Sequence, residues 1–160
     1  MEKVYWIGIE VVAAKQARHY YEIPHNGLKI LNCTDCKTIE MQDNICRIVF
    51  TDELILIRTE DRDFRDGRQQ ADWIKDNREE NNIYCFDTKG NLLWNIGEIV
   101  GDIKMAFDCI YHITPGNARK LYGKFVRPSK YLFHCSAGGF GFLIDAKKKK
   151  LLIKKSGMAR

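Results

Sequence analysis

Two stretches in the second half of the chain read as the same β-hairpin written twice. The first spans residues 83–94 and the second spans residues 142–153. Each consists of an apolar strand, an Asp, a short polar turn and a second apolar strand that opens on two leucines. Apolar runs of this length on either side of such a turn are typical of antiparallel hairpins. The repeat therefore predicts an all-β fold.

A third hairpin is expected nearer the middle of the chain. Residues 45–50 are rich in branched side chains, and the short turn at 51–53 joins them to the continuous apolar run of residues 54–58. An uninterrupted apolar run indicates a strand that is covered on both faces. Together with the later hairpins, this predicts an antiparallel meander of about seven to nine short strands, propeller-blade-like or sandwich-like, with little helix.

The first hairpin resembles part of a β-propeller blade of the quinoprotein-like type, the pair formed by its third and fourth strands. In that family an Asp, a turn Gly and a Leu-Trp pair recur once per blade, and here they are Asp87, Gly90, Leu93 and Trp94. The second hairpin departs from the pattern, since Lys149 stands where the Gly is expected and Ile153 replaces the Trp. The resemblance implies blade-like hairpins, but a propeller needs about four or more blades. This chain has room for two or three, so we do not expect it to close a ring alone.

The region from Thr38 to Lys155 also resembles small bacterial all-β proteins without an assigned activity. These proteins pair one hairpin of the pattern YCFD..G.LLW with a final hairpin of the pattern GF...D....K. The resemblance implies a bacterial protein of similar fold, and it carries no functional residue over to this sequence.

The domain organisation follows from length and composition. A chain of 160 residues with 45% apolar and 29% charged residues is typical of one globular domain, here residues 1–160. Residues 1–36 give no firm secondary-structure pattern. Residues 59–82 are dense in charge and predict a long loop, which in a compact domain is usually functional or disordered.

The net charge of +5 is unevenly distributed along the chain. Residues 1–115 contain 14 Lys and Arg against 20 Asp and Glu, whereas residues 116–160 contain 12 against the single acid Asp145. Such asymmetry can mark a basic surface for an anionic partner.

Two sets of residues are candidates for partner binding. One is Trp73, an apolar side chain within the charged loop. The other is the basic run Lys147, Lys148, Lys149 and Lys150. Aromatic residues near this run could stack on nucleic-acid bases: Tyr122, Phe125, Tyr131 and Phe133. Alternatively, the lysines protect an edge strand from pairing, or they form ion pairs with the acidic first 115 residues.

The cysteines raise the alternative that the protein is a zinc-stabilised domain. Cys33 and Cys36 have the spacing of half a zinc site, but structural zinc needs four ligands. The one further half-site, Cys109 and His112, falls in an apolar strand where positions three apart point to opposite faces. The other cysteines, like Cys109 itself, lie in apolar runs and are expected to be free thiols of a reducing compartment: Cys46, Cys85 and Cys135.

No pattern in the sequence sets up catalysis. The four histidines, His19, His25, His112 and His134, have no nucleophile or acid placed beside them by the sequence. No apolar run approaches the roughly 20 residues of a membrane span, and the first ten residues make a poor signal peptide. The sequence therefore predicts a cytoplasmic, non-enzymatic binding module without a cofactor. Its partner is expected to be a protein, or alternatively a nucleic acid or another anionic molecule bound through the basic C-terminal third.

Overall fold

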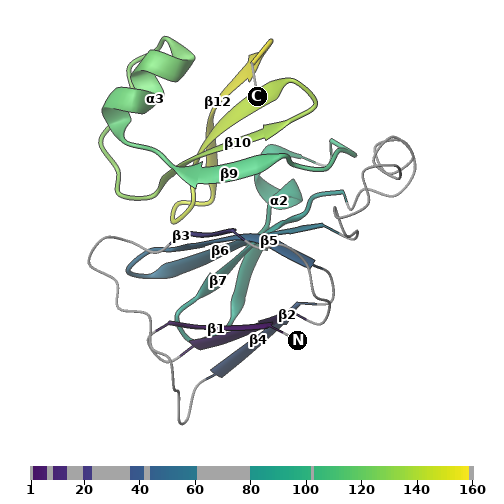
Figure 1. The fold of residues 1–160 in the computed structure, drawn as a ribbon. Coiled ribbons are helices and arrows are strands. Elements are labelled where there is room, and N and C mark those ends of the chain that lie inside the picture. The colour runs from purple at the N-terminus through teal and green to yellow at the C-terminus, as the bar shows by residue number, and fades with distance from the viewer. Residues whose placement is uncertain are drawn as a thin grey trace.

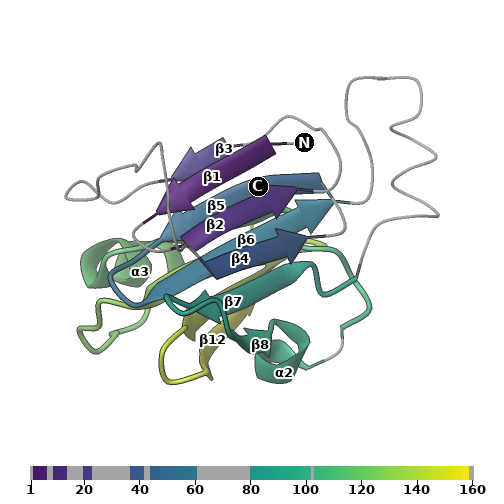
Figure 2. The same ribbon diagram turned by 90° about the horizontal axis from the view of Figure 1, so that it is seen from below.

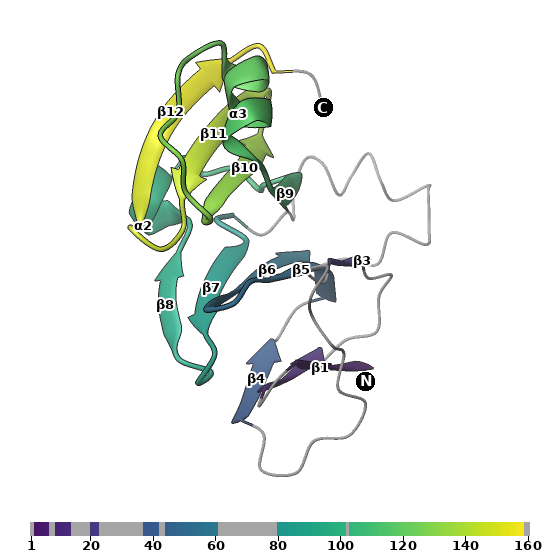
Figure 3. The same cartoon turned by 90° about the vertical axis from the view of Figure 1, so that its left-hand side faces the viewer.

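The described residues form three β-sheets stacked in layers (Figure 1). The computed structural model describes residues 2–6, 9–13, 20–22, 37–41, 44–60, 80–101 and 103–158. In Figure 3 the layers are seen edge-on, with the C-terminal sheet and helix α3 (Pro115–Tyr122) at one end and the N-terminal sheet at the other. The all-β class predicted from the sequence is confirmed.

The middle layer is a five-stranded sheet in the order β3-β5-β6-β7-β8. Its strands are β3 (Tyr20–Glu22), β5 (Asn44–Phe50), β6 (Leu54–Glu60), β7 (Ile83–Asp87) and β8 (Leu92–Asn95). Strands β5 to β8 form the predicted antiparallel meander, and β3 adds to its edge in parallel with β5.

The C-terminal layer is a four-stranded antiparallel meander in the order β12-β11-β10-β9. Its strands are β9 (Cys109–His112), β10 (Leu132–Ala137), β11 (Phe140–Asp145) and β12 (Lys150–Ser156). The two hairpins recognised in the sequence are β7–β8 and β11–β12, so each closes its own meander. The propeller resemblance itself stays a prediction.

The N-terminal layer is a three-stranded sheet in the order β1-β2-β4. Strand β1 (Glu2–Trp6) pairs antiparallel with β2 (Ile9–Ala13), and β2 pairs parallel with β4 (Lys37–Met41). Figure 2 shows this sheet lying across β5, β6 and β7. The described residues thus hold twelve strands, more than the seven to nine expected, because the first 41 residues contribute four.

The middle sheet is apolar on both faces, as predicted for β6. Leu54 and Leu56 point into the core shared with the C-terminal sheet, while Ile55 and Ile57 point into the core shared with β4. Because strand side chains alternate between faces, an uninterrupted apolar run is what a strand between two layers requires.

Two helices in the described residues were not expected from the sequence. No helix was expected at residues 97–105, but Gly97–Val100 form the short helix α2, which contacts both β8 and β12. No helix was expected at residues 114–117 either, but they begin helix α3, which covers the outer face of the C-terminal sheet. Among the described residues little helix is present, as expected.

The ends of the predicted 59–82 loop are tied together. Thr59 belongs to β6, and its backbone exchanges hydrogen bonds with Asn82: the Thr59 N–H donates to the Asn82 carbonyl at 3.0 Å, and Asn82 Nδ2 donates to the Thr59 carbonyl at 2.7 Å. Asn82 is buried and also bonds both backbone groups of Phe107. The first and last residues of the predicted loop, Thr59 and Asn82, are therefore hydrogen-bonded to each other. Residues 61–79 lie outside the described part of the chain.

Candidate functional site

Helix α3 is placed by its own sequence and by the sheet beneath it. The Thr114 side chain accepts a hydrogen bond from the Asn117 N–H, and Pro115 occupies the first helical turn, where its missing N–H costs nothing. Gly123 ends the helix with φ +70°, a conformation that favours glycine. Ala118 and Tyr122 are buried against the C-terminal sheet, which leaves the opposite face of α3 in solvent.

A buried hydrogen bond fixes α3 to β10. The Tyr122 hydroxyl lies 2.6 Å from His134 Nδ1, and the Tyr111 ring of β9 lies 4.9 Å from the imidazole, centroid to centroid. Burial lowers the pKa of His134, and burial raises the pKa of Tyr122. The pair is therefore neutral near neutral pH. It satisfies two polar groups under the helix, as expected of a structural histidine.

The exposed face of α3 and the loop after it are cationic. The sequence contains no Asp or Glu between Asp108 and Asp145. Four exposed cations lie on α3 or within five residues of its end: Arg119, Lys120, Lys124 and Arg127. Among the described residues none of the four forms an ion pair. A fifth cation, Lys155 of β12, donates to the Leu121 carbonyl at 3.2 Å in the last turn of the helix.

One aromatic ring stands exposed among these cations. Phe125 is 74% exposed, the largest value among the big apolar side chains of the described residues. Tyr122 and Phe133 are buried, and Tyr131 packs under the Lys147 ammonium, which lies 5.2 Å from the ring centroid. Of the four aromatics that the sequence offered for stacking, Phe125 is thus the one with a free face. We call Arg119, Lys120, Lys124, Phe125 and Arg127 together the α3 surface.

An open depression borders the α3 surface. Its walls come from the end of β9 and from α3: Tyr111, His112, Ile113, Asn117, Lys120 and Leu121. The walls combine apolar side chains with an amide, an imidazole and an ammonium group. Such a lining suits a flat, partly polar ligand that carries negative charge.

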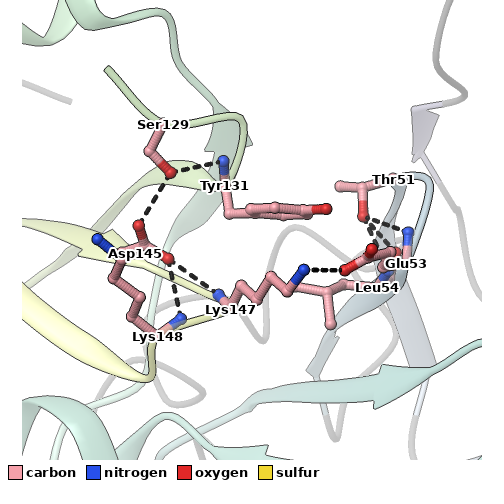
Figure 4. A network of polar contacts seen from close by, with 8 residues as sticks. All are labelled: Thr51, Glu53, Leu54, Ser129, Tyr131, Asp145, Lys147 and Lys148. Carbon is pink, nitrogen blue, oxygen red and sulfur yellow. Dashed lines mark hydrogen bonds and ion pairs between the residues drawn. The ribbon is translucent and has the colours of Figure 1, made fainter. Parts of the chain in front are cut away.

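The predicted lysine run lies at the β11–β12 turn, where it is partly neutralised (Figure 4). Lys147 Nζ forms an ion pair of 2.5 Å with Glu53, in the turn between β5 and β6, and this bond raises the pKa of Lys147. Lys149 Nζ pairs with Glu98 at 2.9 Å. Lys148 and Lys150 are exposed. The structure thus supports, for two of the four lysines, the alternative that they pair with the acidic part of the chain.

Asp145 organises this turn from below. Its carboxylate accepts hydrogen bonds from the backbone N–H groups of Lys147 and Lys148, at 3.1 and 2.9 Å, and from the Ser129 hydroxyl at 2.9 Å (Figure 4). Asp87 holds the first hairpin's turn in the same way, through the N–H groups of Lys89 and Asn91. The Asp of each repeat is therefore a turn-forming residue.

Several sequence candidates fall outside the described residues. These are Trp73, Cys33 and Cys36, together with His19 and His25. Within the described residues no three metal-ligating side chains converge. Cys109 contacts the Ser136 hydroxyl at 3.0 Å, whereas His112 bonds the Lys130 carbonyl at 2.8 Å, so the two do not form a half-site.

The described cysteines are free thiols. Cys85 and Cys135 lie in the core between the two larger sheets, where burial raises the pKa of each thiol. They are therefore small core residues, as predicted, while the side chain of Cys46 is outside the described part.

Comparison with known proteins adds nothing to the geometry. No family model, curated protein or solved structure matches the chain. The two helices of the described residues, of four and eight residues, are too short to cross a lipid bilayer. Function is therefore inferred from the surface of the described residues.

Proposed function

We propose that the protein is a non-enzymatic interaction module that binds an anionic partner through the α3 surface. The observation that carries this proposal is the set of four exposed cations around α3, with no carboxylate in the 36 residues between Asp108 and Asp145. Opposite charges raise the rate and the selectivity of association. A basic binding surface in the C-terminal third was expected from the sequence. We now assign it to α3 and the residues after it, and not to Lys147–Lys150 at the β11–β12 turn.

A structural role for the cations explains only part of this surface. Arg119 and Lys120 lie in the last turn of α3, where positive charge interacts favourably with the helix dipole. Lys124 and Arg127 follow the end of the helix, and no carboxylate of the described residues pairs with them. Their charge is thus available to a partner.

Retention on a heparin column under a rising salt gradient tests the proposal. The double variant Arg119→Glu/Lys124→Glu is expected to elute at lower salt than the wild type, since it reverses two cations of the α3 surface. The control is Lys37→Glu/Lys89→Glu, which changes the net charge equally at two exposed lysines elsewhere. This control is expected to elute close to the wild type.

Two outcomes would contradict the proposal. Equal losses in both double variants would show that retention follows net charge alone. A larger loss in Lys148→Glu/Lys150→Glu than in Arg119→Glu/Lys124→Glu would place the anion site at the lysine turn instead.

A further inference from the structure

The α3 surface and its border show two features that a simple polyanion site does not need. One is the exposed Phe125 ring of the α3 surface, and the other is the adjoining depression between β9 and α3 with its mixed lining. We infer that the anionic partner is a single-stranded nucleic acid, with one base stacked on Phe125 and another held in the depression. This inference rests on the proposed function and names the class of partner.

The loop that carries Phe125 is anchored on both sides. Before it, the Gly123 N–H donates to the Arg119 carbonyl at 2.8 Å and closes the helix. After it, Val126 is buried in the core beneath α3. A ring presented by such a loop can meet a flat ligand without first ordering the backbone, which reduces the entropy cost of binding.

The cations flank the ring along the chain. Lys124 directly precedes Phe125, and Arg127 follows two residues later. Proteins that bind single strands combine a cationic groove for the phosphates with aromatic side chains on which bases stack. Stacking accepts any base, because every base has a flat π face.

The depression supplies a second, more polar position. The Tyr111 and Leu121 side chains offer apolar contact, the Asn117 amide can bond a base edge, and the Lys120 ammonium can contact a phosphate. Leu121 and Phe125 are four residues apart, so their Cα atoms lie at most about 14 Å from each other. At 3.4 Å per stacked nucleotide, the two positions are therefore at most about four nucleotides apart.

Other anionic partners fit these features less well. A base in a duplex is already stacked and paired, so it cannot lie on Phe125 without being unpaired. A helix that binds a lipid surface presents an apolar face to it, but the apolar residues Ala118 and Tyr122 of α3 are buried against the sheet. The exposed residues of the helix include Asn117, Arg119 and Lys120.

Fluorescence anisotropy with labelled oligonucleotides of about twelve nucleotides, a length within the range of known single-strand sites, tests the inference. The expected loss of affinity in Phe125→Ala is about 5- to 150-fold, the range found for removing one stacking aromatic. Phe125→Trp is expected to retain binding. The control Leu93→Ala removes another exposed apolar side chain, on β8, and is expected to bind like the wild type.

The salt dependence gives an independent readout. With up to four phosphate contacts, the slope of log K against log salt is expected to reach about −3 for the wild type. Phe125→Ala is expected to keep this slope, because it removes no charge, whereas Arg119→Glu/Lys124→Glu is expected to flatten it. Circular dichroism of Phe125→Ala should match the wild type, since the ring is exposed.

The outcomes separate the inference from the proposed function. If Phe125→Ala binds oligonucleotides as the wild type does, while Arg119→Glu/Lys124→Glu does not, the α3 surface binds anions without stacking and the inference is wrong. Tighter binding to duplex DNA, to phosphatidylserine vesicles or to polyaspartate than to single strands also overturns it. If the wild type binds none of these polyanions, the proposed function fails as well.

Discussion

The strongest structural prediction concerns Trp94, the last residue of the repeated pattern in the first hairpin. Its indole is 2% exposed in the core between the two larger sheets. Its Nε1–H donates to the Ala146 carbonyl at 2.9 Å, within buried surroundings. Ala146 belongs to the turn of the second hairpin, so this bond links the two copies of the repeat.

The cost of Trp94→Phe can be worked from this geometry. A phenyl ring keeps most of the apolar contact but has no donor, which leaves the Ala146 carbonyl without the Nε1–H. An unsatisfied buried polar group costs about 1–3 kcal/mol. The indole is larger by roughly 40 Å³, and a residual cavity costs about 24 cal/mol per Å³, or about 1 kcal/mol. The free energy of unfolding is therefore expected to fall by about 2–4 kcal/mol.

Urea unfolding followed by far-ultraviolet circular dichroism measures this loss. The control is Phe107→Leu, a fully buried side chain of the same core that carries no polar group. It is expected to cost about 1 kcal/mol, from the lost volume and the lost contact between its ring and that of Phe142. If Trp94→Phe costs no more than Phe107→Leu, the hydrogen bond to Ala146 does not stabilise the fold as argued.

Two further predictions concern the second hairpin and the helix. Lys149 has φ +56°, so Lys149→Gly is expected to raise the free energy of unfolding by up to about 1 kcal/mol, less the exposed ion pair with Glu98. Lys148→Gly, at a negative φ, is expected to lower it, and the reverse order in urea unfolding would contradict the strain argument. Burial lowers the pKa of His134 from 6.5, so the unfolded chain takes up a proton before the folded one does as pH falls. The free energy of unfolding is expected to decrease as the pH falls from about 7.5 through 6.5, where the unfolded chain's histidine takes up its proton. This decrease should be smaller in His134→Gln. An unchanged decrease would show that protonation of His134 does not cause it.

The hairpins could be predicted from the sequence because residues close together in the chain determine them. Asp87 and Gly90 specify a turn by their own side chain and backbone preferences, and the structure gives Gly90 a φ of +84°. Gly138 and Gly139 also have positive φ and join β10 to β11.

Helix α3 was missed although its start signal is present in the sequence. Thr114 followed by Pro115 is a good N-cap and first-turn pair, and Gly123 is a good C-cap. The eight residues between include Gly116 and only a short apolar face, so the helical pattern is weak. The helix is stable because Tyr122 finds His134 on β10, a contact that local propensity does not contain.

The candidate binding residues could likewise be predicted from the sequence only in part. The sequence located the excess of positive charge in the last third of the chain and offered Phe125 among four stacking candidates. It allowed ion pairs between the lysine run and the acidic part of the chain, but it could not identify Glu53 and Glu98 as the partners of Lys147 and Lys149, because they are 94 and 51 residues away along the chain.

The sequence by itself determined the hairpins formed by β5–β6, β7–β8 and β11–β12 and the overall sign of the C-terminal charge, because strand patterns, turn chemistry and composition act over a few residues. Only the tertiary structure decided which cations stay unpaired and which aromatic ring stays in solvent. Burial and ion pairing depend on which faces the layers bring together, and that is set by packing of segments far apart in the chain.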